Sequence, residues 1–284
     1  MKTIIELFET CSTKYADNIF LWEKGNGQYQ GTSYQEAREE VYRFAAGLMA
    51  LGIRKGDRIA LLSEGRNAWI IGELGILYAG AINVPISVRI EAGPELKFRL
   101  AHSGSRMVIV SKNQAAKIES IAGELPEVEK VIHLDQKENT AENSLDYRYV
   151  LEKGKDFLQS NYAEFEKTFK SILPGDLANI SYTSGTTADP KGIMLSHLNY
   201  ATNVIQANTL MEIDPTWKTL AFLPWDHAFA HTACLYCFIY NGASIASLEL
   251  GKTPLETLKN IPKNIKEIKP SIMMSVPAFS KTFR

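Results

Sequence analysis

Short apolar runs alternate with stretches of helical periodicity along most of this 284-residue chain. A strand that is apolar on both faces needs cover on both sides, and two parallel strands need a crossover between them, which is usually a helix. In the first half we predict buried strands at 58–63, 81–86, 107–110 and 130–134, with helices at 68–78, 95–102 and 114–123. The alternation therefore predicts an α/β fold with two doubly wound, mostly parallel sheets and helices on both faces.

Residues 135–172 interrupt the alternation. They are polar and weakly periodic, which predicts a surface excursion with one or two helices that leads to a second sheet. Beyond them we predict strands at 177–182, 219–223, 243–248 and 271–276, with helices at 196–210, 228–240 and 255–268. We expect two subdomains, 1–172 and 173–284, the second of them incomplete at its C-terminal end.

The N-terminal segment has its own signals. An amphipathic helix begins near Ile4, a strand follows at 19–22, and a glycine-rich turn comes at 25–27. Ser33 and Glu36 form a plausible capping box for a long helix. Gly52 is a typical C-terminal signal for that helix.

One loop carries chemistry as well as structure. Residues 182–192 read YTSGTTADPKG and combine four hydroxyl side chains with two glycines and one lysine. Glycine lets the backbone approach a ligand closely, free N–H groups and hydroxyls donate to phosphate oxygens, and lysine adds a mobile positive charge. Because the loop follows a predicted strand and precedes a predicted helix, it indicates a phosphate-binding loop. Its spacing differs from the P-loop pattern GxxxxGK[ST].

Charge and cysteine content limit the function classes. Lys plus Arg is 31 and Asp plus Glu is 32, a net charge of −1 that gives no support to a nucleic-acid partner. Three cysteines without framework spacing (Cys11, Cys234 and Cys237) fit a reducing compartment. We find no signal peptide and no apolar run near the ~20 residues of a membrane span. We therefore expect a cytoplasmic protein; peripheral membrane association stays open.

At the hydroxyl-rich loop the chain resembles the adenylate-forming enzymes, which include acyl-CoA synthetases, peptide-synthetase adenylation domains and luciferases. Their signature is close to [ST]SG[ST]TGxPKG, and residues 183–187 and 190–192 match it. Ala188 stands where the family has glycine. If that glycine takes a positive φ, alanine costs roughly 1 kcal/mol or more there.

Other segments resemble the same family. Residues 57–64 with Trp69 resemble the opening of the first sheet, and 79–86 resemble the AGAxxVPI segment. Residues 223–229, LPWDHAF, resemble the LPxxH motif in its long-chain fatty acid form, and 275–279 resemble the segment entering the acyl pocket. The resemblance runs from about residue 30 to the end and covers the first half of the family's usual chain. We expect a truncated domain that is inactive alone.

The resemblance implies the reaction and its participants. A carboxylate attacks the α-phosphorus of ATP, pyrophosphate leaves, and a thiol, usually coenzyme A, then attacks the acyl-adenylate. Mg²⁺ is implied as well, with its family carboxylate ligand lying beyond Arg284. Lys191 would offset developing charge, and His227 would orient the substrate carboxylate. The implied nucleotide-binding residues are Thr183, Ser184, Gly185, Thr186, Thr187, Lys191 and Gly192.

Several candidate residues have structural alternatives. His227 could instead cap a helix or be partly buried, and Trp225 and Phe229 could line an acyl tunnel or belong to the core. His231, four residues after His227, could pair with it on a metal, but no third ligand is evident. The CxxC at Cys234 and Cys237 lies in an apolar helix and favours buried packing over redox or zinc chemistry. The lysines of 259–269 predict a solvated helix face.

Three functions remain in competition. The first is an AMP-forming long-chain fatty acid–CoA ligase, which we take as the leading hypothesis. The second is an adenylating enzyme that loads a carrier protein. The third is a non-catalytic nucleotide-binding or interaction module, and it predicts no acyl-AMP formation. Acyl chain length and oligomeric state are not encoded in these patterns.

Overall fold

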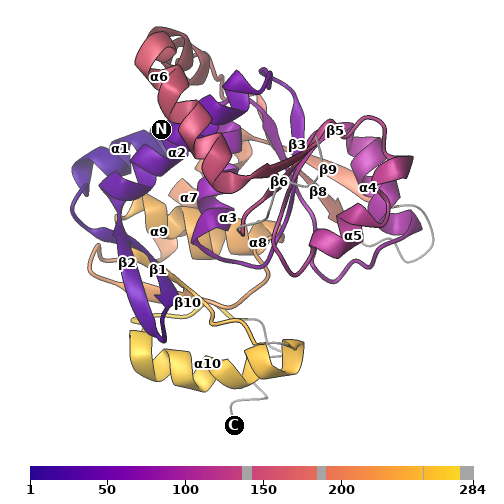
Figure 1. The fold of residues 1–284 in the computed structure, drawn as a ribbon. Coiled ribbons are helices and arrows are strands. Elements are labelled where there is room, and N and C mark those ends of the chain that lie inside the picture. Colours follow the sequence, from indigo (N-terminus) through magenta and orange to yellow (C-terminus); the bar gives the residue numbers. More distant parts are fainter. Residues whose placement is uncertain (136–142, 184–189, 252, 276–284) are drawn as a thin grey trace.

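The computed structural model describes residues 1–135, 143–183, 190–251 and 253–275. Two sheets and the helices around them make up the fold (Figure 1). The strands are mostly parallel, and helices cover both faces of the larger sheet, as predicted.

The larger sheet has seven strands in the order β7-β6-β5-β3-β4-β8-β9. All neighbours are parallel except β8 and β9, which are antiparallel. The strands span β3 Arg58–Leu62, β4 Ile82–Pro85, β5 Ser105–Val110, β6 Lys130–His133, β7 Ser144–Asp146, β8 Leu177–Thr183 and β9 Lys191–Ser196. This sheet buries apolar side chains on both faces, because Ile59 and Leu61 belong to one core cluster while Ala60 and Leu62 belong to another.

The smaller sheet has the order β10-β11-β1-β2. Its strands are β1 Ile19–Gly25, β2 Gln28–Ser33, β10 Lys218–Ala221 and β11 Ser244–Ser247. Strand β1 pairs in parallel with β11 and antiparallel with β2. Asn26 and Gly27 both have positive φ, 51° and 82°, as a tight two-residue hairpin turn requires.

The two sheets exchange strands across residue 172. Strands β8 and β9 come after it yet extend the larger sheet, and β1 and β2 come from the N-terminus yet complete the smaller one. The expectation that 135–172 leads to a second sheet was therefore wrong, because this segment returns the chain to the sheet it left. The subdomain division at 172 does not coincide with the division between the sheets.

The polar segment contains α6 (Tyr147–Lys170), which is two helical stretches joined at a kink at Asn161 and packs against α2 (Tyr34–Ala50). Two glycines allow the close approach: a Cβ on Gly47 would overlap the Val150 carbonyl oxygen, and one on Gly154 would overlap the Arg43 carbonyl oxygen. Phe165 packs edge-on against Tyr42 at 5.0 Å between ring centroids. The excursion thus contributes to the core through a few large side chains.

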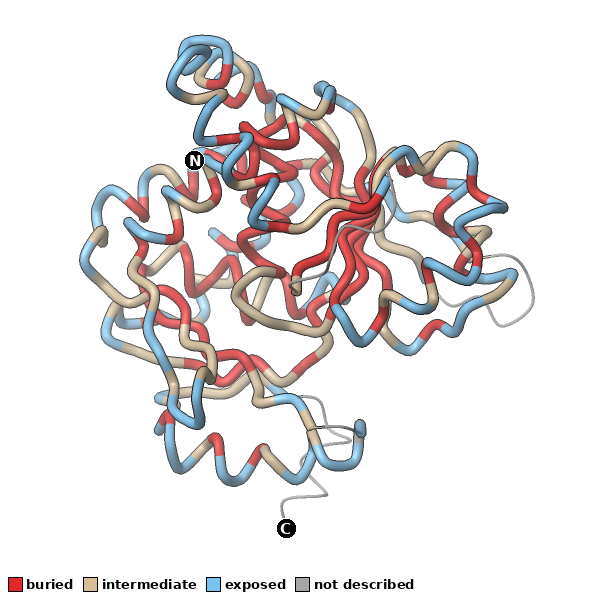
Figure 2. Tube along the Cα trace, viewed as in Figure 1, coloured by how far each residue is buried: buried red, intermediate tan, exposed pale blue. Residues whose placement is uncertain are grey.

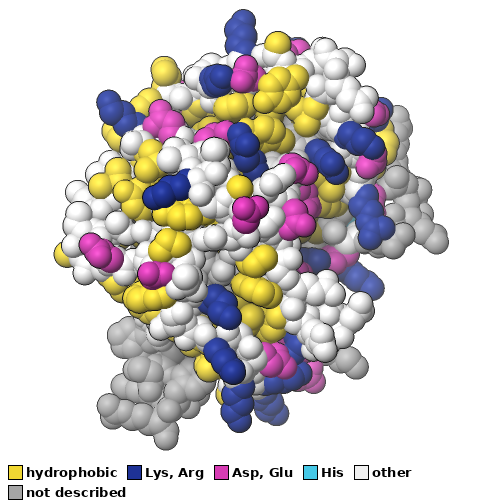
Figure 3. All heavy atoms as spheres, turned by 90° about the vertical axis from the view of Figure 1, so that its left-hand side faces the viewer, with side chains coloured by type: hydrophobic (Ala, Val, Ile, Leu, Met, Phe, Trp, Pro, Cys, Tyr) yellow, Lys and Arg dark blue, Asp and Glu magenta, His cyan; other side chains and the backbone are white. Residues whose placement is uncertain are grey.

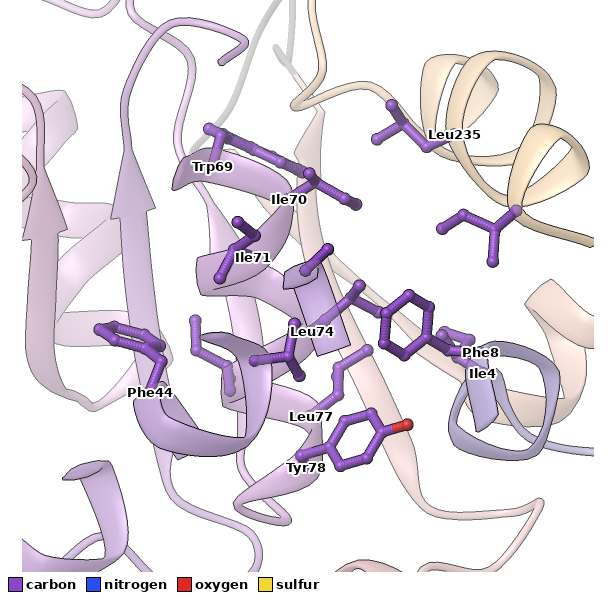
Figure 4. Packing of buried hydrophobic residues seen from close by; sticks show 14 of the residues in the cluster. Ile4, Phe8, Phe44, Trp69, Ile70, Ile71, Leu74, Leu77, Tyr78 and Leu235 are labelled. Carbon is purple, nitrogen blue, oxygen red and sulfur yellow. The ribbon is translucent and has the colours of Figure 1, made fainter. Parts of the chain in front are cut away.

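The remaining helices divide between the two faces of the larger sheet. The cluster that contains Ile59 and Leu61 packs one face of the sheet against α1 and α3. The cluster that contains Ala60 and Leu62 packs the other face against α4 and α5. Figure 2 shows the buried strands at the centre with exposed helix faces outside. Figure 4 shows the apolar side chains of α3 packed between α1, α2 and Leu235. The bounds are α1 Ile4–Lys14, α3 Asn67–Tyr78, α4 Pro94–Ser103, α5 Ala115–Glu119, α7 His197–Leu210, α8 Ala228–Ala230, α9 Cys237–Tyr240 and α10 Pro254–Ile268.

Most predicted elements are present with shifted ends, and the capping box at Ser33 and Glu36 is confirmed. The helix predicted at 228–240 is continuous but has a π-helical centre, His231–Tyr236. The helix predicted at 114–123 breaks into α5 and a 3₁₀ turn, Ala122–Glu124. The strand predicted at 271–276 is reduced to one bridge, Thr219 with Ile272, and Val276 lies outside the described residues.

The surface agrees with the balanced composition. Positive and negative side chains are interspersed on the face shown in Figure 3, with basic ones gathered at the lower end, where Figure 1 places α10. The lysines of α10 are exposed, which confirms the predicted solvated face. Among the helices described, none has the length and apolar character needed to span a bilayer.

Candidate functional site

The hydroxyl-rich loop connects two antiparallel strands. Its flanking residues Thr183, at the end of β8, and Lys191, at the start of β9, are register partners, and both are exposed. The predicted strand–loop–helix order was wrong, because β9 intervenes before Ser196 caps α7. The predicted Ser184, Gly185, Thr186 and Thr187, together with Ala188, lie outside the described residues.

The end of β8 lies at the carboxyl edge of the larger sheet. Strand β8 runs parallel to β4 and β3, so their C-terminal ends lie along one edge. In open α/β sheets, ligands bind at this edge. Because a strand follows the loop, phosphate donors here would be backbone N–H groups and hydroxyls of the loop, rather than a helix N-terminus.

The end of β8 is held from one side by α4. The Tyr182 hydroxyl lies 2.8 Å from Nδ1 of His102, and the Arg99 guanidinium lies 5.4 Å from the Tyr182 ring centroid. Burial raises the pKa of Tyr182, although the positive charge of Arg99 opposes the shift. On β9, a Cβ at Gly192 would stand 3.4 Å from the Tyr182 ring, so glycine lets the strand lie close to it.

Trp225 lies in the core. Its indole Nε1 donates to the Ala221 carbonyl oxygen at 3.1 Å, and its ring meets Trp69 edge-on at 5.6 Å. Gly65 packs on the indole face, where a Cβ would come within 2.6 Å of ring atoms. These are the contacts of a core side chain, and a role for Trp225 in substrate binding stays a prediction.

His227 points outward from the turn before α8, with 66% of its side chain exposed. It occupies the N-cap position but makes no side-chain capping bond, so neither structural alternative describes it. Its Nε2 is 3.9 Å from a carboxylate oxygen of Asp226. An exposed imidazole with one acidic neighbour is accessible to a ligand.

Phe229 lines a cavity of about 310 Å³ between α7, β9 and the turn carrying His227. The Phe229 side chain is more than half exposed. Lys191 precedes Leu195 by four residues on the same strand, roughly 13 Å along it. Strand β9 therefore contributes both to the cavity, through Leu195, and to the end of the loop, through Lys191. The lining residues are Leu195, Asn199, Tyr200, Asn203, Ala228, Phe229 and Thr232.

His231 does not share a face with His227. Its side chain is completely buried and its Nε2 lies 2.8 Å from Oε1 of Glu73 on α3. Burial disfavours the charged imidazolium, but the Glu73 charge and hydrogen bond outweigh it and raise the pKa of His231 above its ordinary value. In the part of the chain that the structure describes, His, Cys, Asp and Glu side chains form no cluster of three that could hold a metal.

Sequence reasoning missed a second cavity, of about 350 Å³, at the carboxyl ends of β3, β5, β6, β1 and β11. Arg66 bridges it, donating to Asp135 at 2.8 Å, and Glu64 accepts from Ser111 at 2.7 Å. These residues lie one to four positions beyond the ends of the buried strands β3, β5 and β6, which is the signal that could have identified them. The charged side chains of the cavity are largely paired with one another. The cavity is lined by residues that follow strands of both sheets.

Cys234 and Cys237 are buried and unpaired, which confirms the packing prediction. Burial raises the pKa of the Cys234 thiol to about 12 and that of Cys237 to about 11. Thiols held in this neutral form are weak nucleophiles.

The fold is that of the N-terminal domains of adenylate-forming enzymes. The inhibitor-bound N-terminal domain of FACL13 from Mycobacterium tuberculosis superposes with a TM-score of 0.77 at 24% identity, over 100% of this chain and 65% of that one. The family model described as AMP-binding enzyme matches residues 8–283. The chain belongs to this family.

Two curated relatives indicate the range of acceptors within the family. A long-chain-fatty-acid–CoA ligase of Gallus gallus is 26% identical over 97% of this chain. A chloroplastic long-chain-fatty-acid–[acyl-carrier-protein] ligase of Arabidopsis thaliana is 25% identical over 99% of it. The chain spans 36% and 39% of the lengths of these two relatives.

Proposed function

We propose that this chain supplies the phosphate-binding and acyl-binding portion of an enzyme that activates a fatty acid with ATP and transfers the acyl group to coenzyme A. One observation carries the proposal: Thr183 and Lys191 are register partners at the loop end of the β8–β9 hairpin, at the carboxyl edge of the parallel strands β4 and β8. The family membership supports the reaction class.

The residues divide the work by position. The loop between Thr183 and Lys191 would hold the β- and γ-phosphates of ATP through hydroxyls and backbone N–H groups, and the Lys191 ammonium would offset negative charge as pyrophosphate leaves. His227 would orient the acid, whose carboxylate oxygen attacks the α-phosphorus. Mg²⁺ would supply further charge neutralisation on the phosphates when bound.

The cavity at Phe229 supports an apolar acid. Its lining includes Leu195, Tyr200 and Phe229, and also Ala228, which directly follows His227. An acyl chain lying against this lining would leave its carboxylate near the turn that carries His227. Long-chain specificity is the finer part of the proposal, and the ligase of Gallus gallus supports it.

Coenzyme A is our preferred acceptor, and the Arabidopsis thaliana relative is the reason to keep a carrier protein as the second candidate. Both acceptors present a thiol, whose sulfur attacks the acyl carbonyl of the acyl-adenylate and releases AMP. A cytoplasmic location stays a prediction that nothing in the fold tests.

The experiment is pyrophosphate release from ATP by the complete gene product that contains this chain, with acetate, octanoate, palmitate and a set of amino acids. Release that requires a fatty acid is expected. Thioester formation with coenzyme A or with acyl-carrier protein then separates the two acceptors. Silence with every acid would overturn the proposal and favour the non-catalytic module.

A further inference from the structure

A buried polar cluster lies behind the candidate site. Glu73 is the single charged residue of α3 and is 1% exposed, and His231, its hydrogen-bond partner, is completely buried. Asn83 on β4 also donates to the Glu73 carboxylate, at 3.0 Å. Even a paired buried carboxylate is often no more stabilising than well-packed apolar side chains, so a role besides stability is worth seeking for this arrangement.

Both ring nitrogens of His231 have a hydrogen-bond partner. Its Nε2 lies 2.8 Å from the Glu73 carboxylate and its Nδ1 lies 3.3 Å from the carbonyl oxygen of His227. A carbonyl oxygen can only accept a hydrogen bond, so Nδ1 donates. When Nε2 donates to the carboxylate as well, His231 is an imidazolium, and this is the form that the inference assigns to it.

This pair holds the turn that presents His227. The His227 carbonyl accepts from the His231 ring and also from the His231 backbone N–H at 3.1 Å. The π-helical segment begins at His231, and such segments often occur at functional sites. The exposed His227 side chain therefore projects from a backbone that is held from inside the protein.

The same carboxylate reaches the strand that leads to the phosphate loop. Asn83, bonded to Glu73, is the register partner of Asn179 on β8, and Asn179 accepts from Ser181 at 2.7 Å. Ser181 lies two residues before Thr183. Glu73 is thus joined to both segments that carry the predicted site residues.

We propose that Glu73 and His231 form a positioning pair that fixes the His227 turn relative to β8 and so sets the geometry of the adenylation site. The inference rests on the proposed function. Glu73 and His231 do not contact the substrate in this proposal, because both act through the backbone of His227. A misplacement of about 1 Å in a catalytic group can reduce a rate roughly 100-fold, which is why such a pair would be retained.

Unpaired atoms around the pair argue against a purely stabilising role. Asn83 Oδ1 and Asn179 Nδ2 are buried without a hydrogen-bond partner among the described residues, whereas the Tyr236 and Tyr200 hydroxyls interact with Glu73 and Ser181. Unsatisfied buried groups are destabilising and are often found where function requires them.

The titratable groups that face His231 are Glu73 on α3, Tyr200 on α7, Tyr236 on the π-helical segment, and Asp226 and His227 in the turn. Burial raises the pKa of both tyrosines, so the phenols stay neutral at ordinary pH.

The first measurement uses the wild-type 284-residue chain labelled with ¹⁵N-histidine. Two-bond ¹H–¹⁵N correlations at pH 7 should show both ring nitrogens of His231 protonated. His197 provides the neutral reference, because burial lowers its pKa to about 4. A neutral His231 would overturn the inference without any variant or any activity.

The second measurement compares variants of the complete gene product in the adenylation step. Glu73→Gln keeps the size and one acceptor oxygen but removes the charge, so the alkaline limb of kcat should move down by at least ~1 pH unit. At pH 8 we expect kcat to fall at least ~10-fold while KM for ATP changes little. Glu73→Asp, which keeps the charge, should retain the wild-type pH profile.

Glu9→Gln is the matched control for lost stability. Glu9 is a half-buried carboxylate that accepts from Arg38, Tyr42 and Tyr78, away from the candidate site. The Glu9→Gln variant should have a lower Tm and an unchanged pH profile of kcat. If Glu73→Gln behaves like Glu9→Gln, the pair is only structural. If wild type adenylates no acid, the proposed function fails, and the histidine spectra still decide whether the pair exists.

Discussion

Lys191 is the side chain on which the phosphate site can be tested most directly. It is exposed at the start of β9, so Lys191→Ala should leave folding intact. Removing one electrostatic contact to the departing pyrophosphate should slow adenylation by at least ~10-fold. Pyrophosphate release with a fatty acid measures the effect.

Lys259→Ala is the control, because Lys259 is exposed on α10. It should retain the wild-type rate. A Lys191→Ala protein that is as fast as this control would remove the loop from the reaction.

His197 should make the folded state sensitive to acid. Burial lowers its pKa to about 4, whereas an unfolded histidine has a pKa of about 6.5. Between these values only the unfolded state binds the proton, so the free energy of unfolding decreases as pH falls from about 6.5 to about 4, by up to roughly 3 kcal/mol. Above that range the imidazole is neutral in both states and contributes no pH dependence.

Urea unfolding of wild type and His197→Gln between pH 4 and pH 7 measures this contribution. Paired carboxylates such as Glu9 lose stability in acid in both proteins, so the difference between the two curves isolates His197. Parallel curves would show that His197 binds its proton equally well in both states.

At the scale of elements, the α2–α6 contact depends on glycine. An alanine at Gly154 would overlap the Arg43 carbonyl oxygen, and neither backbone can move without disturbing the other helix. Gly154→Ala should lower the free energy of unfolding by about 2 kcal/mol or more. Gly175→Ala, where a Cβ would meet nothing within 4 Å, should change it by less than about 0.5 kcal/mol. Equal urea midpoints for the two variants would contradict the close packing.

Buried elements could be predicted from sequence, and edge elements could not. Strands β3, β4 and β5 are buried on both faces and mostly apolar, so their composition identifies them. Strands β2 and β9 have mostly exposed side chains and become strands because a neighbour offers backbone hydrogen bonds. The prediction that a helix directly follows the phosphate loop was wrong for this reason, because β9 follows it.

The candidate site divides in the same way. Lys191 and His227 could be predicted because short motifs contain them. The pairing of His231 with Glu73 could not, since 158 residues separate them and only the folded chain brings them within 2.8 Å. The available signal was Glu73 as an isolated charged residue in an apolar helix, and this signal does not indicate which residue pairs with it.

For the whole molecule, the N-terminal hairpin is a structural necessity. Strand β1 lies between β11 and β2, and Phe20 and Leu21 are completely buried. A chain without residues 1–33 would expose the edge of β11 and should aggregate. Size-exclusion chromatography with light scattering measures this. Removal of Met1 and Lys2 alone should leave a protein with unchanged elution, and a monomeric, cooperatively folding 34–284 chain would contradict the prediction.

The parallel pairing of Leu21 with Ile245 also sets a timetable for synthesis. The ribosome must add 224 further residues, the difference between 245 and 21, before β1 meets its partner. At roughly 5–20 residues per second this takes about 10 to 45 s. During that interval the emerging hairpin exposes apolar side chains that belong in a sheet, which makes it a natural client for a nascent-chain chaperone.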